Sequence, residues 1–232
     1  MGIKDAVDAT KTEMTRWQTI KADPLFMFSR ALTKAYGLFV KMAYPFASVG
    51  KGLAMHRTSR LFRPHARQIK LGNDVSIMKD TWLNIAPSPD DEIKLLIDDR
   101  CLIGLRTTIT VKNHVHLESD VVLADSVVIA DHTRAFDDIN VPIYGQGTSS
   151  GGTIRIETGC WIGHCSAVIC NRGNLVIGRN SVIGANCVVT HSIPPYSIVM
   201  GNPARIVKHF DPVRGAWTVG PAGKVEAEIA AQ

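Results

Sequence analysis

The chain lacks any uninterrupted apolar run of about 18 residues, so its sequence predicts no membrane-spanning helix. The N-terminal segment MGIKDAVDATKTEM has no apolar core, which argues against a secretory signal peptide. The five cysteines include no CxxC pair, which argues against a disulfide framework and against a zinc ribbon. These absences predict a cytoplasmic protein. Because 45% of the 232 residues are hydrophobic, the chain can still bury a sizeable core.

The charge is distributed unevenly along the chain. Residues 1–70 carry a formal charge of +9 and residues 71–232 carry −4, which together give the net charge of +5. Such a basic N-terminal region suits an anionic ligand, a lipid surface or nucleic acid, and an ordinary solvated helical face explains the count equally well. No RNP, KH, helix-turn-helix or zinc-finger pattern accompanies it, so we expect no nucleic-acid partner.

A six-residue rhythm organises the middle of the chain, and neither a helical nor a strand period explains it. Three such hexads make one triangular turn, and stacked turns make a parallel β-helix with a narrow aliphatic interior. The aliphatic positions are Leu71, Ile77, Leu83, Ile97, Ile103, Ile109, Leu117, Leu123, Ile129, Ile156, Ile162, Val168, Ile177, Ile183 and Val189. Small or β-branched residues follow many of them four places later, at Val75, Thr81, Cys101, Thr107, Val121, Val127, Cys160, Ser166, Ser181 and Cys187.

The rhythm predicts a mainly β protein in three parts. Residues 1–64 form an N-terminal helical, basic region, residues 65–207 form the β-helix, and residues 208–232 form a short C-terminal tail. All irregular steps follow the third position of a turn, so the extra residues project from one edge of the triangular prism. The longest is a loop excursion at residues 132–153. Insertions stacked on one edge usually mark the binding side, and we expect the chemistry there.

Residues 25–50 read as an amphipathic helix in which Arg30, Lys34 and Lys41 interrupt the apolar positions. Pro24 suits the helix start, and Pro45 bends or ends it. The favoured prediction is that this helix packs on the base of the β-helix or on a neighbouring subunit. The alternative is a peripheral contact with a membrane surface or with a lipid-linked substrate, which would place the protein at the inner face of the membrane.

Three segments of the chain resemble the hexapeptide-repeat acyltransferase family. They are VVTHSIPPYSIVMGNPARIV (188–207), CWIGHCSAVI (160–169) and IADHTRAFDDINVPIYGQG (129–147), of which the last is similar to a stretch of the sugar O-acetyltransferase branch. The resemblance implies a left-handed parallel β-helix, a homotrimer with active sites in the clefts between subunits, and acetyl-CoA or another acyl-CoA as co-substrate. The chain departs from the family pattern at Arg134, which replaces a histidine, and at Ile139, which replaces a proline.

His132 begins the long excursion, and the resemblance identifies it as the catalytic general base. Asp131, Asp137 and Asp138 flank the loop, and one of them is expected to fix the tautomer of the imidazole ring. Asp131 is placed with His132 in the catalytic set. Residues Asn113, His114 and His116 are predicted at the same corner one turn below, where they could orient His132 or contact the acceptor. Asn113 is counted as catalytic, and substrate binding is assigned to Arg134, Asp137, His114 and His116.

The resemblance places the CoA donor at a second set of residues. Ala185 and Thr190 would line the pantetheine arm, because backbone amides over small residues let a linear chain lie close. Arg205 and Lys208 would lie near the nucleotide phosphates, where two cations suit a polyanion. His164 is also assigned to the donor side.

The sequence therefore predicts an acyl-CoA-dependent O-acyltransferase that acts on a sugar hydroxyl of a polysaccharide or glycolipid precursor. Acetyl is the default acyl group. Succinyl is the alternative, because Arg106, Arg134 and Arg172 are expected at or near the insertion edge, where they could pair a second carboxylate. A γ-carbonic-anhydrase-like zinc protein would use His164, but Ile169 and Cys170 stand where a further histidine is needed, so no metal is expected. A non-catalytic β-helix scaffold is the remaining alternative.

Overall fold

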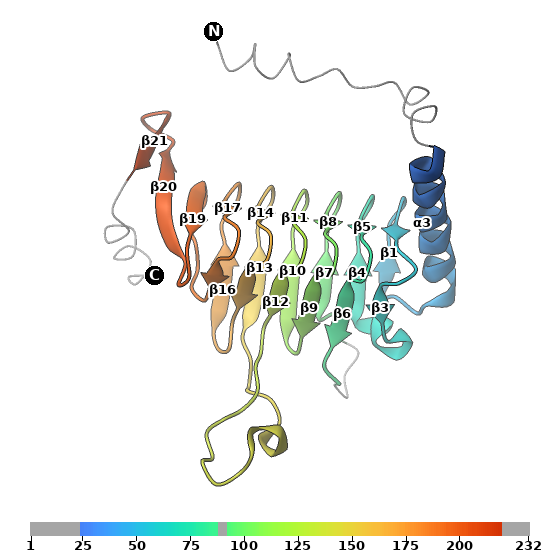
Figure 1. Ribbon diagram of the computed structural model, residues 1–232, viewed down its shortest axis with the longest axis horizontal. Coiled ribbons are helices and arrows are strands. Elements are labelled where there is room, and N and C mark those ends of the chain that lie inside the picture. The colour runs from blue at the N-terminus through green and yellow to red at the C-terminus, as the bar shows by residue number, and fades with distance from the viewer. Residues whose placement is uncertain (1–23, 88–91, 220–232) are drawn as a thin grey trace.

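The computed structural model describes residues 24–87 and 92–219, which form a β-solenoid of six triangular turns with a helix across one end (Figure 1). Each turn contributes one strand to each of three sheets, in which strands three apart in the chain pair in parallel. The last parallel strand of the second sheet is the exception, because it pairs with the strand two places before it. The first sheet contains β1 (Ser48–Val49), β4 (Ile69–Leu71), β7 (Leu95–Ile97), β10 (His114–Leu117), β13 (Thr153–Ile156) and β16 (Asn174–Ile177). The second contains β2 (Ala54–Met55), β5 (Ser76–Ile77), β8 (Leu102–Ile103), β11 (Val122–Leu123), β14 (Trp161–Ile162), β17 (Val182–Ile183) and β19 (Ser197–Met200). The third contains β3 (Arg60–Leu61), β6 (Trp82–Ile85), β9 (Thr108–Val111), β12 (Val128–Ala130), β15 (Ala167–Ile169) and β18 (Val188–Val189).

The predicted hexad pattern is confirmed residue by residue. All fifteen aliphatic positions are at most 2% exposed, and all ten small positions are at most 1% exposed. The aliphatic side chains fill the interior, and the small residues lie at the corners where the chain turns between sheets. We call the corner between the first and second sheets the first corner, that between the second and third the second corner, and that from the third sheet to the next turn the third corner.

The solenoid begins earlier than expected. Residues Val49, Met55 and Leu61 repeat the six-residue spacing, and β1, β2 and β3 pair in parallel with β4, β5 and β6. The first turn therefore starts at Ser48, within the segment assigned to the helical region, rather than at residue 65. Val49 and Leu61 are only partly buried, because they lie at the end of the stack.

The C-terminal segment is also more ordered than a loose tail as far as residue 219. Strand β20 (Arg205–Asp211) pairs antiparallel with β19, and β21 (Ala216–Val219) pairs antiparallel with β20. The remaining residues of the predicted tail, 220–232, lie outside the described residues.

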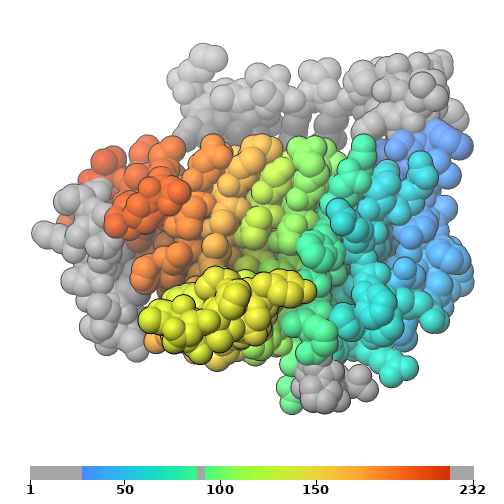
Figure 2. Space-filling model, turned by 60° about the horizontal axis from the view of Figure 1, so that its bottom comes forward, coloured from blue at the N-terminus to red at the C-terminus, as the bar shows by residue number. Residues whose placement is uncertain are grey.

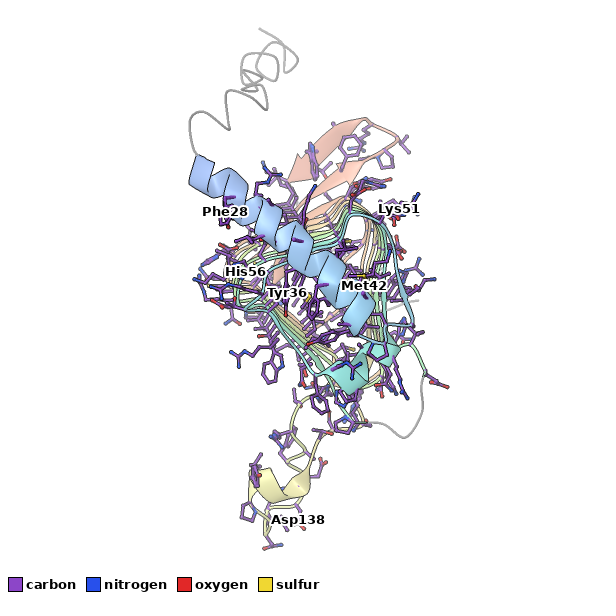
Figure 3. The ribbon with its side chains drawn as sticks, turned by 90° about the vertical axis from the view of Figure 1, so that its right-hand side faces the viewer. Phe28, Tyr36, Met42, Lys51, His56 and Asp138 are labelled. Atoms are coloured by element: carbon purple, nitrogen blue, oxygen red, sulfur yellow. The ribbon has the colours of Figure 1, made fainter. Side chains whose placement is uncertain are left out.

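The predicted amphipathic helix is α3 (Pro24–Ala43), which starts at Pro24 and ends two residues before Pro45. It crosses the open end of the first turn, as the view along the solenoid shows (Figure 3). Its inner face is packed tightly, because Val40 is fully buried and a Cβ added to Gly37 would lie 2.2 Å from the carbonyl oxygen of Leu53. The prediction that the helix packs on the base of the β-helix is therefore confirmed. No helix in the described part of the chain is long and apolar enough to cross a bilayer.

Candidate active site

The longest insertion leaves the third corner between β12 and β13, as the spacing of the hexads predicted. We call residues 131–152 the insertion arm. Its two sides run antiparallel: the N–H of Ser149 donates to the carbonyl of Thr133 over 2.8 Å, and Arg134 forms a β-bridge with Thr148. A short 3₁₀ helix, η2 (Ile143–Gln146), lies near the tip. The arm stands out from the edge of the solenoid in Figure 1 and in front of the turns, in yellow, in Figure 2.

Asp131 and His132 form a hydrogen-bonded pair at the base of the arm. Nδ1 of His132 lies 2.7 Å from Oδ1 of Asp131, and the side chains are 10% and 0% exposed, respectively. The sequence left open which of three aspartates fixes the imidazole, and the geometry selects Asp131. Asp137 and Asp138 lie farther out on the arm and are exposed.

The Asp131 carboxylate is held by backbone N–H groups of the turn between β9 and β10, one coil below. Oδ1 accepts from the N–H of Lys112 over 2.8 Å, and Oδ2 accepts from the N–H groups of Asn113 and His114 over 2.7 and 3.0 Å. A carboxylate surrounded by donors acts as an acceptor toward the imidazole as well, so Nδ1 of His132 carries the hydrogen. Nε2 is thereby left with its lone pair, and it has no hydrogen-bond partner among the described residues.

The turn between β9 and β10 also holds the C-terminal half of the insertion arm. The side-chain amide of Asn113 donates to the carbonyls of Ser150 and Gly152 over 3.0 and 3.2 Å. The Nζ atom of Lys112 donates to Oγ1 of Thr148 over 3.1 Å and to the carbonyl oxygen of Ser149. Asn113 therefore positions the arm beside His132 rather than contacting the imidazole.

Gly151 passes close to the pair, in a backbone conformation that suits glycine. Its φ angle is +81°, and an added Cβ would lie 2.8 Å from Nδ2 of Asn113 and 3.3 Å from Cβ of His132. Sequence reasoning missed both Lys112 and Gly151. Neither belongs to the hexad pattern, and their roles depend on contacts between residues about 20 to 40 positions apart.

The other predicted acceptor residues are only partly brought together. His114 opens β10 beside the corner, with Nδ1 3.1 Å from the carbonyl oxygen of Ile93. His116 does not lie at the corner as expected. It lies two residues along β10 on the outer face of the first sheet, where Nε2 is 2.8 Å from Oδ2 of Asp98. Arg134 is exposed on the arm, with its guanidinium 5.7 Å from the centre of the Tyr144 ring.

The predicted donor residues lie mainly at a different edge from His132. His164 and Ala185 are exposed at the second corner on successive turns, and the N–H of Asn186 donates to the carbonyl of His164 over 2.9 Å. Thr190 lies at the third corner, two turns beyond His132, and Oγ1 is 2.9 Å from Nδ1 of His191. Arg205 and Lys208 are exposed on β20.

A second expected position, that of Arg106, is also wrong. Arg106 was expected near the insertion edge, but it lies at the second corner, where Nε donates to Oγ of Ser126 over 3.3 Å. The reason is the regular six-residue step from Ile103 to Ile109, which carries the chain from the second sheet to the third. Arg172, by contrast, follows β15 and does lie at the third corner.

The cysteines show no sign of nucleophilic activation. Burial raises the pKa of the Cys101 and Cys160 thiols to about 11 and also raises the pKa of Cys170 and Cys187, so these thiols are poor sources of thiolate. Cys165 is exposed. Within residues 24–87 and 92–219, no group of three or more His, Cys, Asp or Glu side chains is arranged to hold a metal ion.

The chain is similar in sequence to curated acetyltransferases. No family model matches the chain. It is 32% identical over 182 residues to "Probable acetyltransferase Rv3034c" of Mycobacterium tuberculosis, a match that covers 78% of this chain and 55% of the relative. It is 28% identical over 141 residues to galactoside O-acetyltransferase of Escherichia coli K12, covering 60% of this chain and 56% of that protein. The chain thus spans about half the length of these two relatives.

Among solved structures, the chain is similar in fold to AntD, an N-acyltransferase from Bacillus cereus solved with dTDP and coenzyme A. One such structure has a TM-score of 0.60 and 18% sequence identity, with 84% of this chain and 95% of that chain covered. At this identity the likeness concerns the fold.

Proposed function

We propose that this chain, a member of the hexapeptide-repeat acyltransferase family, is a CoA-dependent O-acyltransferase with His132 as its general base. The observation that carries the proposal is the pair of Asp131 and His132, joined over 2.7 Å at the base of the insertion arm. The proposed acceptor is a sugar hydroxyl of a polysaccharide or glycolipid precursor. A galactoside O-acetyltransferase among the relatives supports this choice of acceptor class.

The reaction requires one proton acceptor and no covalent enzyme intermediate, because the thioester is already activated. Nε2 of His132 takes the proton of the sugar hydroxyl while its oxygen attacks the thioester carbonyl and the C–O bond forms. As the tetrahedral intermediate collapses, the C–S bond breaks and the proton passes from the imidazolium to the departing CoA sulfur. The buried Asp131 carboxylate keeps the ring in the tautomer that can accept this proton, and it stabilises the imidazolium that follows.

Two chains are needed to bring the donor residues to His132. Within one chain, Ala185 lies at the second corner and His132 lies at the third, so a site that contains both is best formed in a cleft between subunits of a homotrimer. The arm supports such an assembly, because its tip exposes large apolar side chains. They are Phe136, Ile139, Ile143 and Tyr144, which are 50% to 95% exposed.

Acetyl remains the default acyl group. Succinyl is the alternative, and with Arg106 at another corner it relies on Arg134 and Arg172, the two arginines that do lie at the insertion edge. A preference for succinyl-CoA that disappears in Arg134→Gln or Arg172→Gln would support the alternative.

The test is release of free CoA thiol from acetyl-CoA or succinyl-CoA in the presence of a panel of sugars and oligosaccharides. Wild-type protein is expected to release thiol only with an acceptor, and His132→Ala is expected to lower the rate about 10²- to 10⁴-fold, the usual contribution of a general base. His65→Ala, which removes a histidine in the 3₁₀ helix η1 (Arg63–Gln68), is the matched control and should keep full activity.

Two results would contradict the proposal. Release that survives in His132→Ala would show that another group is the base. No release with any pair of substrates, together with no thermal stabilisation by CoA, would favour the non-catalytic scaffold.

A further inference from the structure

Helix α3 exposes apolar side chains along the face turned away from the solenoid. Its inner face buries Val40 and Gly37, yet the opposite face exposes five large apolar residues by 52% to 73%. At 100° per residue these fall in one sector with two exposed alanines. We call this sector the outer stripe; it contains Phe28, Ala31, Leu32, Ala35, Leu38, Phe39 and Met42. In Figure 3 the helix faces the viewer, and Phe28 and Met42 mark the two ends of the stripe.

Cations border the outer stripe on one side. Arg30, Lys34 and Lys41 follow one another along the helix, which contains no Asp or Glu. The cations of this basic border line two hollows that lie between α3 and the solenoid. One is about 310 Å³ and is lined by Lys34, Lys41 and Lys51. The other is about 450 Å³ and is lined by Arg30, Lys34, His56 and Lys79 among others.

We propose that the outer stripe docks on the surface of a bilayer that contains anionic phospholipids. A helix that only covers the end of a solenoid needs one apolar face. Helix α3 has apolar side chains both on the face that packs on the solenoid and on the opposite, exposed face. The stripe would enter the boundary between headgroups and acyl chains, while the basic border and the two hollows receive lipid phosphates. The proposal does not depend on the enzymatic activity proposed above.

The charge of α3 favours an anionic bilayer over a second copy of this chain as the partner of the outer stripe. Two α3 helices packed stripe to stripe would bring six cations to one interface, with no carboxylate on either helix to neutralise them. Anionic headgroups supply the opposite charge instead.

The test is sedimentation of the purified full chain with vesicles of phosphatidylcholine, with and without phosphatidylglycerol. We expect binding to the phosphatidylglycerol vesicles that weakens with added salt, and little binding to phosphatidylcholine alone. Replacing the basic border, as Arg30→Gln with Lys34→Gln and Lys41→Gln, should weaken binding about 100-fold, since each cation near the surface contributes about fivefold.

The stripe is tested by Leu38→Gln with Met42→Gln, which alters two outward side chains and should weaken binding at least about tenfold. Val213→Gln and Arg179→Gln are the matched controls, because they change an exposed apolar residue and an exposed cation far from α3 and should bind like wild type. Thermal unfolding checks that each variant is folded.

The proposal is overturned if the wild-type chain does not bind the anionic vesicles, or if the stripe variant binds them as well as wild type does. It is also overturned if the stripe variant changes the oligomeric state measured by light scattering, because the stripe would then be an interface between copies of the chain. Loss of vesicle binding with an unchanged oligomeric state supports it.

Discussion

Asp131 links the fold to the proposed chemistry through a single carboxylate. It is fully buried, it accepts N–H bonds from Lys112, Asn113 and His114 in the turn below, and it accepts the bond from His132. The same side chain thus ties two turns of the solenoid together and sets the tautomer of the proposed base. An amide in its place cannot accept from all these donors, because its nitrogen only donates.

We therefore expect Asp131→Asn to lower kcat for acyl transfer by about 10²-fold or more, with a small change in KM. The amide either donates to Nδ1 of His132, which moves the ring hydrogen to Nε2, or it leaves backbone N–H groups unpaired. The measurement is steady-state thiol release together with urea unfolding. Asp99→Asn is the matched control, because Asp99 accepts the N–H of Asn73 over 2.6 Å in a neighbouring turn but has no described histidine partner. Equal activity in Asp131→Asn and wild type would contradict the assignment.

At the scale of elements, each turn is tied to the next by side chains as well as by parallel strands. Glu118 follows β10 and bonds the next turn: Oε1 accepts from Nε of Arg155 over 2.8 Å, and Oε2 accepts from the N–H and Oγ1 of Thr158 over 3.0 and 2.9 Å. Burial alone would raise the pKa of the Glu118 carboxyl, but its bonds to Arg155 and Thr158 outweigh burial and hold the pKa below its ordinary value.

A carboxyl whose pKa is lowered by folding stabilises the protein above its unfolded pKa, and this stabilisation is lost as the pH falls through the folded pKa. We expect Glu118→Gln to lower the free energy of unfolding by about 1 kcal/mol at neutral pH, a modest value because Arg155 is largely exposed. The deficit should shrink below about pH 4.5, the ordinary pKa of a glutamate.

Urea unfolding of wild type and Glu118→Gln over a range of pH measures this effect. Glu157→Gln serves as the comparison, because Glu157 lies 3.9 Å from Nε of Arg179 in a looser pair and should show a smaller effect. A Glu118→Gln deficit that stays constant as the pH falls would show that the lost stability has another origin.

At the scale of the whole molecule, the corner geometry predicts that activity is shared between chains. His132→Ala removes the base at the third corner, and Ala185→Trp blocks the donor position at the second corner. Each variant alone should be inactive. Subunits of the two variants mixed in equal amounts should recover about one quarter of wild-type activity, since a random trimer has that fraction of clefts with both sides intact.

Thiol release by the co-expressed variants, with light scattering to confirm a mass near three times 25.3 kDa, measures this complementation. A mixture as inactive as its parents, although trimeric, would place the complete site within one chain. A monomer with full activity would contradict the assembly altogether.

The solenoid could be predicted from the sequence because its period is local. Each hexad carries its own aliphatic and small residue, so Ile103 and Thr107 mark their places without knowledge of distant segments. The same regularity located the insertion edge and His132 on it. The start of the solenoid at Ser48 was missed, because no small residue stands four places after Val49 or Leu61 in the first turn.

The repeat, the insertion edge and the candidate base could all be inferred from the order of the amino acids. The folded chain was needed to show that Asp131 is the partner of His132 and that Lys112 and Asn113 hold the arm. It also showed that Arg106 and His116 lie elsewhere and that α3 leaves an apolar face uncovered. The difference lies in the sequence separation of the residues involved. Burial in a repeat follows from neighbours a few residues apart, whereas a hydrogen bond between stacked turns joins residues about 20 or more apart, whose meeting depends on how long each insertion is.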